Sequence, residues 1–253
     1  MLSESEQNTT RLLTEKYSGR ETPEYFADVE RLKAGEPYAY VLGYEDFLGA
    51  RVDLSHKPMI PRPETAHWVL QAIEELRKKG NAPLRVIDLF SGSGNIGLGL
   101  LKNHPNVFVE FSEIDANLSE QILKSVRLSN FDESRVKIFA GDALQGMTGE
   151  YDAIFANPPY IAPEAKNELD PEMSFEPELA FFGDNSGLYH HELLIEKAWD
   201  FLKPGGAVYM EADEDQRPAI EAMLKNTSAP KWTYEFWSDQ YGQVRFPVLR
   251  KII

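Results

Sequence analysis

The chain has 253 residues, of which 42% are hydrophobic, enough for one sizeable domain with a small appendage. Its 26 Lys and Arg against 41 Asp and Glu give a formal net charge of −15, which opposes non-specific attraction to a nucleic-acid backbone. Because the chain has no cysteine, disulfides, thiolate metal sites and a cysteine nucleophile are excluded.

Residues 1–7 carry Glu4 and Glu6 and no apolar run, unlike a secretory signal or an Arg-rich transit peptide. No stretch approaches the roughly 20 apolar residues that a membrane helix needs. We therefore expect a cytoplasmic protein with no membrane span.

The first third of the chain predicts two small units. Residues 3–34 have the pattern of short polar helices with too few apolar positions for an independent core. Residues 44–54 look extended, three prolines between 58 and 63 form a stiff connector, and residues 66–76 have helical spacing. We expect a helical region over 1–43, a connector over 44–80 and the main domain over 81–253.

In the main domain, strand-like runs alternate with helical patterns. The runs cover residues 84–90, 107–111, 135–139, 151–156 and 207–211. This alternation predicts an α/β fold with a mostly parallel sheet and helices on both faces. The last two runs, 232–237 and 244–249, have only a turn between them, so we expect an antiparallel hairpin at the end of a seven-stranded sheet.

A glycine-rich turn follows the first strand of this domain. It consists of Phe90, Ser91, Gly92, Ser93 and Gly94. Its two glycines let the backbone pass close to a ligand, and the free amides of the following helix attract a carboxylate or phosphate. With Gly97 the turn also satisfies the dinucleotide fingerprint G-x-G-x-x-G, so the glycines alone fit either a nicotinamide cofactor or S-adenosylmethionine.

Acidic residues follow the next two strands. Glu113 closes the second strand and is the favoured acceptor for ribose hydroxyls, with Asp115 as the alternative. Asp142, followed by Ala143, comes after the third strand, where it either contacts a base edge or caps the local backbone.

Asn157, Pro158, Pro159 and Tyr160 come directly after the strand at 151–156, at the sheet edge where open α/β folds bind ligands. We call residues 157–160 the NPPY segment. Methylation of an amide nitrogen needs acceptors for its N–H protons, and the Asn157 side-chain oxygen and the Pro158 carbonyl are suited to this. Pro159 stiffens the segment, and Tyr160 is suited to stack on a flat substrate group.

The ordered landmarks resemble those of the HemK/PrmC family, the protein-glutamine methyltransferases that modify the Gly-Gly-Gln motif of peptide-chain release factors. The landmarks are PYAYVLGYEDFLG at 37–49, IPRPET at 60–65, DLFSGSG at 88–94, NPPY at 157–160, FEPEL at 175–179 and LKPGG at 202–206. NPPY is shared with enzymes that methylate adenine amines. The IPRPET and FEPEL segments are therefore what distinguishes a protein-glutamine methyltransferase from those enzymes. The resemblance implies a class I, Rossmann-like methyltransferase fold.

The resemblance also implies the site. The turn at 90–94 with Glu113, Asp142, Ala143 and Asn157 would hold S-adenosylmethionine, leaving S-adenosylhomocysteine as product, and the NPPY segment would hold the target glutamine. We expect a release factor as the protein partner, no metal and a monomer.

Two departures from the family pattern are Phe90, where the family usually has a small residue, and a short segment before Tyr38. Alternative functions are methylation of a ribosomal-protein glutamine or of an adenine amine in nucleic acid. More distant ones are a nicotinamide-dependent oxidoreductase and a non-catalytic cofactor-binding scaffold. The NPPY segment argues against the oxidoreductase and an intact Asn157 against the scaffold.

Three weaker signals have mostly structural interpretations. His190 and His191 are expected to be core or surface histidines. The acidic run Glu211, Asp213, Glu214 and Asp215 is expected to be a solvated loop that caps the next helix. Arg62 and Glu64 either organise the site or are simply exposed.

Overall fold

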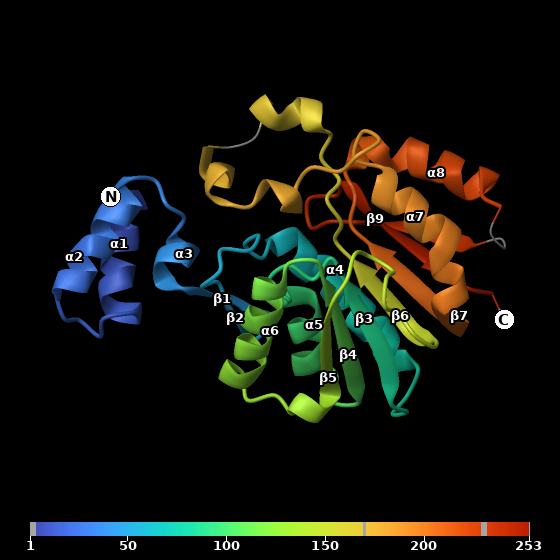
Figure 1. The fold of residues 1–253 in the computed structure, drawn as a ribbon, viewed down its shortest axis with the longest axis horizontal. Coiled ribbons are helices and arrows are strands. Elements are labelled where there is room, and N and C mark those ends of the chain that lie inside the picture. Colours follow the sequence, from blue (N-terminus) through green and yellow to red (C-terminus); the bar gives the residue numbers. More distant parts are fainter. Residues whose placement is uncertain (1–3, 169–170, 229–231, 253) are drawn as a thin grey trace.

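The computed structural model describes residues 4–168, 171–228 and 232–252, and Figure 1 shows their arrangement. The sequence of residues 1–7 predicts no secretory or transit leader, and residues 1–3 of this segment lie outside the described residues. Across the described part of the chain, no helix combines the length and apolar character needed to cross a membrane.

A seven-stranded sheet forms the centre of the molecule. Its strands are β3 (Leu84–Leu89), β4 (Val107–Glu113), β5 (Val136–Ala140), β6 (Tyr151–Ala156), β7 (Leu202–Met210), β8 (Thr233–Ser238) and β9 (Val244–Arg250). Their order is β5-β4-β3-β6-β7-β9-β8. The first five strands in this order are parallel and β9 pairs antiparallel with both β7 and β8. The predicted α/β sheet with a terminal hairpin is confirmed.

Strand β7 begins at Leu202, five residues before its predicted start. Tyr151 pairs with Leu202, whereas Ala153 pairs with Ala207. The intervening Pro204, Gly205 and Gly206 are therefore accommodated as a bulge. Such residues weaken a strand pattern in sequence, but a bulge admits them at an irregular position of the ladder.

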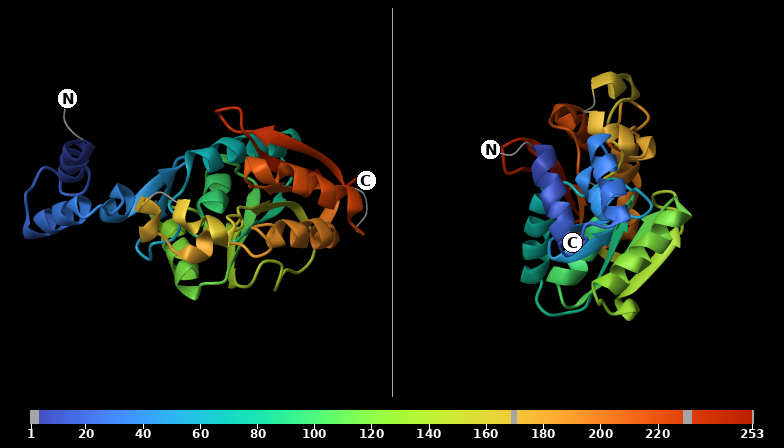
Figure 2. Two further views of the ribbon diagram at one scale, coloured as in Figure 1. Left: turned by 90° about the horizontal axis from the view of Figure 1, so that it is seen from above. Right: turned by 90° about the vertical axis from the view of Figure 1, so that its left-hand side faces the viewer.

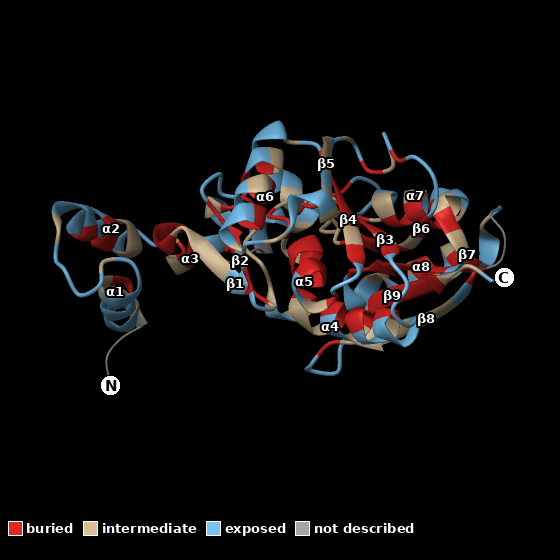
Figure 3. Cartoon of the chain, turned by 90° about the horizontal axis from the view of Figure 1, so that it is seen from below, coloured by how far each residue is buried: buried red, intermediate tan, exposed pale blue. Residues whose placement is uncertain are grey.

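Helices cover both faces of the sheet, as predicted. Among the described residues, the α-helices around the sheet are α4 (Pro63–Lys78), α5 (Asn95–Asn103), α6 (Ala116–Leu128), α7 (Tyr189–Lys197) and α8 (Arg217–Asn226). Consecutive strand residues such as Val86 and Ile87 face opposite sides of the sheet, and they belong to two separate apolar clusters. The first cluster packs against α4, α5 and α6 and the second against α7 and α8. Figure 3 shows the resulting concentration of buried residues in the sheet and α5.

The N-terminal region projects from this domain (Figure 2). It contains α1 (Glu4–Glu15), α2 (Pro23–Lys33) and α3 (Tyr38–Leu42), and a hairpin of β1 (Tyr44–Phe47) and β2 (Ala50–Asp53) leads to α4. The helices share a small apolar cluster built on Leu12, Tyr25, Val29 and Val41.

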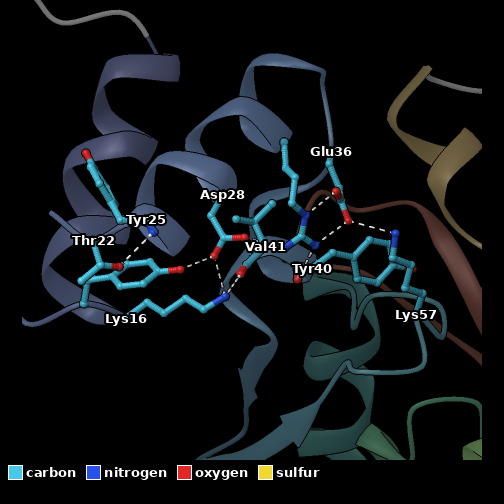
Figure 4. A network of polar contacts seen from close by, with 10 residues as sticks. Lys16, Thr22, Tyr25, Asp28, Glu36, Tyr40, Val41 and Lys57 are labelled. Atoms are coloured by element: carbon cyan, nitrogen blue, oxygen red, sulfur yellow. Dashed lines mark hydrogen bonds and ion pairs between the residues drawn. The ribbon is translucent and has the colours of Figure 1, made fainter.

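A polar network fastens this region to the connector (Figure 4). Asp28, which is buried, accepts hydrogen bonds from Lys16 and Arg31 at 2.7 Å each. Arg31 also donates to both oxygens of Glu36, at 2.8 Å each. Lys57, beyond β2, lies 3.0 Å from the same Glu36 carboxylate. Ion pairs therefore add to the apolar contacts in holding the helices beside the main domain.

We expect Gly97→Ala to destabilise the protein by about 1–3 kcal/mol, the usual cost of overpacking a core. Gly97 lies inside α5, where alanine would ordinarily be more favourable by about 1 kcal/mol. A Cβ there would lie 2.2 Å from Phe111 Cε1 and 2.9 Å from Val109 Cγ1 on β4. Urea denaturation measures the difference.

Gly99→Ala is the matched control, because it makes the same change in the same helix. Its Cβ would meet side-chain atoms of Leu48 and Phe47 at 3.1–3.2 Å, where a small shift relieves the contact. We expect Gly99→Ala to be less destabilising than Gly97→Ala. Equal effects would contradict the assignment of Gly97 to helix–sheet packing.

We also expect His191 to make the protein less stable in acid. His191 is fully buried in α7 and its Nε2–H donates to the Glu211 carbonyl at 2.9 Å. Burial lowers the pKa of His191 from 6.5 to about 4. The unfolded chain therefore takes up a proton first, and the stabilisation present above pH 6.5 is lost as the pH falls towards 4. Between pH 7.5 and 5 the free energy of unfolding should drop by about 2 kcal/mol from this group.

Denaturation at the two pH values, with His191→Gln for comparison, measures this contribution. The variant lacks the titrating group, so its stability should fall less between pH 7.5 and 5. If both proteins lose the same amount, His191 does not contribute.

Candidate active site

The turn after β3 is shaped by two buried acidic side chains. Asp88 accepts the Gly97 N–H through Oδ2 at 2.9 Å, which ties β3 to α5. Burial raises the pKa of Asp88 well above its ordinary value. Gly94 has φ +78°, and a Cβ there would lie 2.8 Å from Ile122 Cγ1. Both the conformation and the packing therefore require glycine at this position.

Glu113 at the end of β4 lies directly across from this turn. Its Oε2 accepts the Gly92 N–H at 2.7 Å and its Oε1 accepts the Asp115 N–H at 3.0 Å. The sequence predicted Glu113 as a ligand acceptor, and the structure adds that its carboxylate also fixes the glycine turn. Asp115, the alternative, caps α6 through the Asn117 N–H at 2.8 Å.

A cavity of about 590 Å³, which we call the first cavity, opens at the carboxyl ends of β3, β4, β5 and β6. This volume lies within the usual range for small-molecule and cofactor sites. The structure places nine predicted site residues in its wall: Phe90, Ser91, Gly92, Ser93, Glu113, Asp142, Ala143, Asn157 and Pro159. Ala143 is buried, whereas Asp142 is exposed at the rim. Gly94, Pro158 and Tyr160 are not among the residues that line this cavity.

A second cavity of about 460 Å³ lies on the other side of the NPPY segment. Asn157 lines both cavities, Pro159 lines the first and Tyr160 the second. Pro158 is buried between its neighbours. Asn157 is thus placed where the contents of the two cavities would meet.

The backbone of the NPPY segment is packed closely against residues 181–187. Ile161 N–H donates to the Phe181 carbonyl at 2.8 Å, and Gly183 N–H donates to the Ile161 carbonyl at 3.0 Å. A Cβ at Gly183 would lie 2.3 Å from the Pro159 oxygen, and one at Gly187 would lie 1.9 Å from the Tyr160 oxygen. Only glycine permits this approach, which holds the carbonyls of the segment in place.

The IPRPET and FEPEL landmarks meet through one carboxylate. Glu176, which is 7% exposed, accepts the Ile60 N–H at 2.8 Å and pairs with Arg62 at 2.6 Å. Arg62 lines both cavities and Glu64 lines the second. Arg62 is therefore paired and half-buried in the wall of the site rather than simply exposed. That Arg62 and Glu64 organise the site stays a prediction.

The acidic run after β7 divides into two parts. Asp213 forms a capping box with Gln216, and residues 213–215 are exposed, as predicted. The prediction of a solvated loop is wrong for Glu211, which is 2% exposed and lies in the wall of the second cavity. Its position at the carboxyl end of a strand, where Glu113 also lies, is the sequence signal that would have found it.

The two histidines of α7 differ. His191 is a core residue, as predicted. His190 instead lines the first cavity, with its ring centroid 4.6 Å from that of Phe90. Burial lowers the pKa of His190, which favours the neutral imidazole there.

Comparison with known proteins agrees with this arrangement. Residues 69–173 match the model of the methyltransferase small domain family. Solved structures with similar folds include a methyltransferase from Pyrococcus furiosus, with TM-score 0.57, 18% identity and coverage of 92% of this chain and 100% of that one. Another is the 16S rRNA N2 G1207 methyltransferase of Thermus thermophilus in complex with AdoMet and guanosine, with TM-score 0.55, 16% identity, and 82% and 49% coverage. These likenesses establish the class I methyltransferase fold.

Curated relatives are more specific. The release factor glutamine methyltransferase of Streptococcus pneumoniae is 31% identical over 94% of this chain and 83% of its own length. Those of Deinococcus radiodurans and Bradyrhizobium diazoefficiens are 31% and 35% identical, covering 88% and 85% of this chain and 77% and 71% of their own. At these identities over most of both chains, this chain belongs to the family of release factor glutamine methyltransferases.

Proposed function

We propose that the protein transfers the methyl group of S-adenosylmethionine to the side-chain amide nitrogen of the glutamine in the Gly-Gly-Gln motif of a peptide-chain release factor. The observation that carries this proposal is the position of Asn157 between the two cavities. The names of the curated relatives support the release factor as the partner.

The first cavity suits the cofactor in size and in its polar groups. The amides of Ser91, Gly92 and Gly94 already donate within the fold. The N–H groups of Ser93 and of Asn95 at the start of α5, two residues that line the cavity, are suited to receive the carboxylate of the methionine moiety. The Glu113 oxygens retain lone pairs for ribose hydroxyls beside the two N–H groups they already accept. Asp142 and Ala143, at the end of β5, lie at the same cavity and are suited to the base edge.

The second cavity suits the target side chain. Part of its wall is apolar and consists of Met59, Ile161, Met173 and Phe181. Such a wall accommodates the methylene stem of a glutamine. The charged residues in the same wall are Arg62, Arg245, Glu64, Glu211 and Asp213. These lining residues carry no excess of positive charge, which argues against a nucleic-acid substrate.

The chain's own residues would position the amide nitrogen. The Asn157 side-chain oxygen and the Pro158 carbonyl accept its two N–H protons, which turns its lone pair towards the first cavity. When bound there, the cofactor supplies an electrophilic methyl group on a sulfonium. Transfer would form the nitrogen–methyl bond as the carbon–sulfur bond of the sulfonium breaks, and the nitrogen would then lose one of the two protons held by Asn157 and Pro158.

Asn157→Ala should lower kcat at least about 100-fold, the usual loss when one preorganised transition-state partner is removed. A labelled-methyl assay with purified release factor measures kcat. Because Asn157 also lines the first cavity, calorimetric binding of S-adenosylhomocysteine is measured for both proteins and separates a loss of kcat from a loss of cofactor binding. Turnover close to that of the wild type would refute the assigned role of Asn157.

The substrate is tested by transfer of labelled methyl to the release factor and to its Gln→Ala variant at the Gly-Gly-Gln motif. We expect label on the first and none on the second. Parallel reactions contain ribosomal proteins and adenine-containing DNA. Label on either of these, with none on the release factor, would overturn the proposed substrate.

A further inference from the structure

Glu211 is a buried carboxylate that joins three separate parts of the fold. It follows the last residue of β7 and is 2% exposed. Its Oε2 accepts the Thr65 hydroxyl at 2.8 Å and the Trp68 Nε1–H at 2.9 Å, both from the first turns of α4. These two hydrogen bonds fix the carboxylate independently of its contact with the NPPY segment.

The other oxygen of Glu211 holds the side chain of Tyr160. The Tyr160 hydroxyl donates to Glu211 Oε1 at 3.1 Å and accepts a hydrogen bond from Arg245 Nη2 at 3.3 Å. Burial raises the pKa of the Tyr160 phenol and the Glu211 charge raises it further. The phenol therefore keeps its proton, and the direction of both hydrogen bonds is determined.

The backbone at Tyr160 is held by different contacts. Gln216 Nε2 donates to the Tyr160 carbonyl at 2.8 Å, in addition to the close packing of Gly187. Loss of Glu211 would therefore release the tyrosine side chain while these backbone contacts remain.

We propose that Glu211 is a positioning residue which, through the Tyr160 hydroxyl, fixes the aromatic wall of the second cavity beside Asn157. This inference rests on the proposed function, because it assumes that the second cavity holds the target glutamine side chain. Methyl transfer depends on in-line placement, and a displacement of about 1 Å can cost on the order of 100-fold in rate. A tyrosine held at its hydroxyl restricts how the target amide lies against the NPPY segment.

The chain contains a matched control for this arrangement. Tyr209 donates to Glu75 Oε2 at 2.8 Å, and Arg250 donates to Glu75 Oε1 at 2.9 Å. Tyr209 and Glu75 are not among the residues that line either cavity. A tyrosine, a glutamate and an arginine of β9 thus form a similar group away from the site.

The experiment compares Glu211→Gln, Tyr160→Phe, the double variant and Glu75→Gln, using the release factor as substrate. We expect Glu211→Gln and Tyr160→Phe each to lower kcat about tenfold while S-adenosylhomocysteine binding changes less than twofold. The double variant should be no slower than the slower single variant within twofold, because both changes remove one interaction. Glu75→Gln should change kcat less than twofold.

A kcat of Glu211→Gln within twofold of the wild type would overturn the inference, as would losses that multiply in the double variant. A readout in the free enzyme separates this inference from the proposed function. NMR of ¹³C-labelled tyrosine should show slow flipping of the Tyr160 ring in the wild type and faster flipping in Glu211→Gln. Equal flipping rates would overturn the positioning role, whereas absence of methyl transfer by the wild type would overturn the proposed function.

Discussion

The parallel pairing of β3 with β4 on one side and β6 on the other is the constraint on which the site depends. In this register Leu89 lies beside both Ser112 and Ala156. The residues that follow these three positions, Phe90, Glu113 and Asn157, therefore lie at one edge of the sheet, where β3 and β6 end and β4 has its last residue. The helices at the two faces bury the strands that maintain this register, so the packing of the core and the geometry of the site have the same origin.

Much of this arrangement could be predicted from the sequence because its determinants are local. Apolar runs of strand length alternate with helical patterns, and turn residues follow the strands, so both the sheet and its ligand-binding edge are encoded over short distances. The glycine turn, Glu113 and the NPPY segment were identified for this reason. Their roles in binding remain predictions.

The contacts between distant segments could not be predicted in the same way. Glu176 meets Arg62 across 114 residues of sequence, and Glu211 meets Thr65 across 146. Each of these carboxylates lies in a segment rich in charge or proline, a composition that ordinarily indicates exposure. A buried carboxylate requires hydrogen-bonding partners, and here another element supplies the N–H and O–H donors that make the burial possible. Composition gives no information about where those partners come from.

Phe90 shows how backbone and side-chain terms can offset each other in the cofactor turn. Its φ of +56° lies in the left-handed region, which costs a non-glycine residue roughly 1–2 kcal/mol. Its ring contacts that of His190 in α7, and such aromatic pairs contribute about 0.5–1.5 kcal/mol beyond their buried area. Exchanging Phe90 for glycine would relieve the first term and forfeit the second. The ring is also partly buried against the second apolar cluster, so its packing adds to the aromatic contact in offsetting the strained backbone of the cofactor turn.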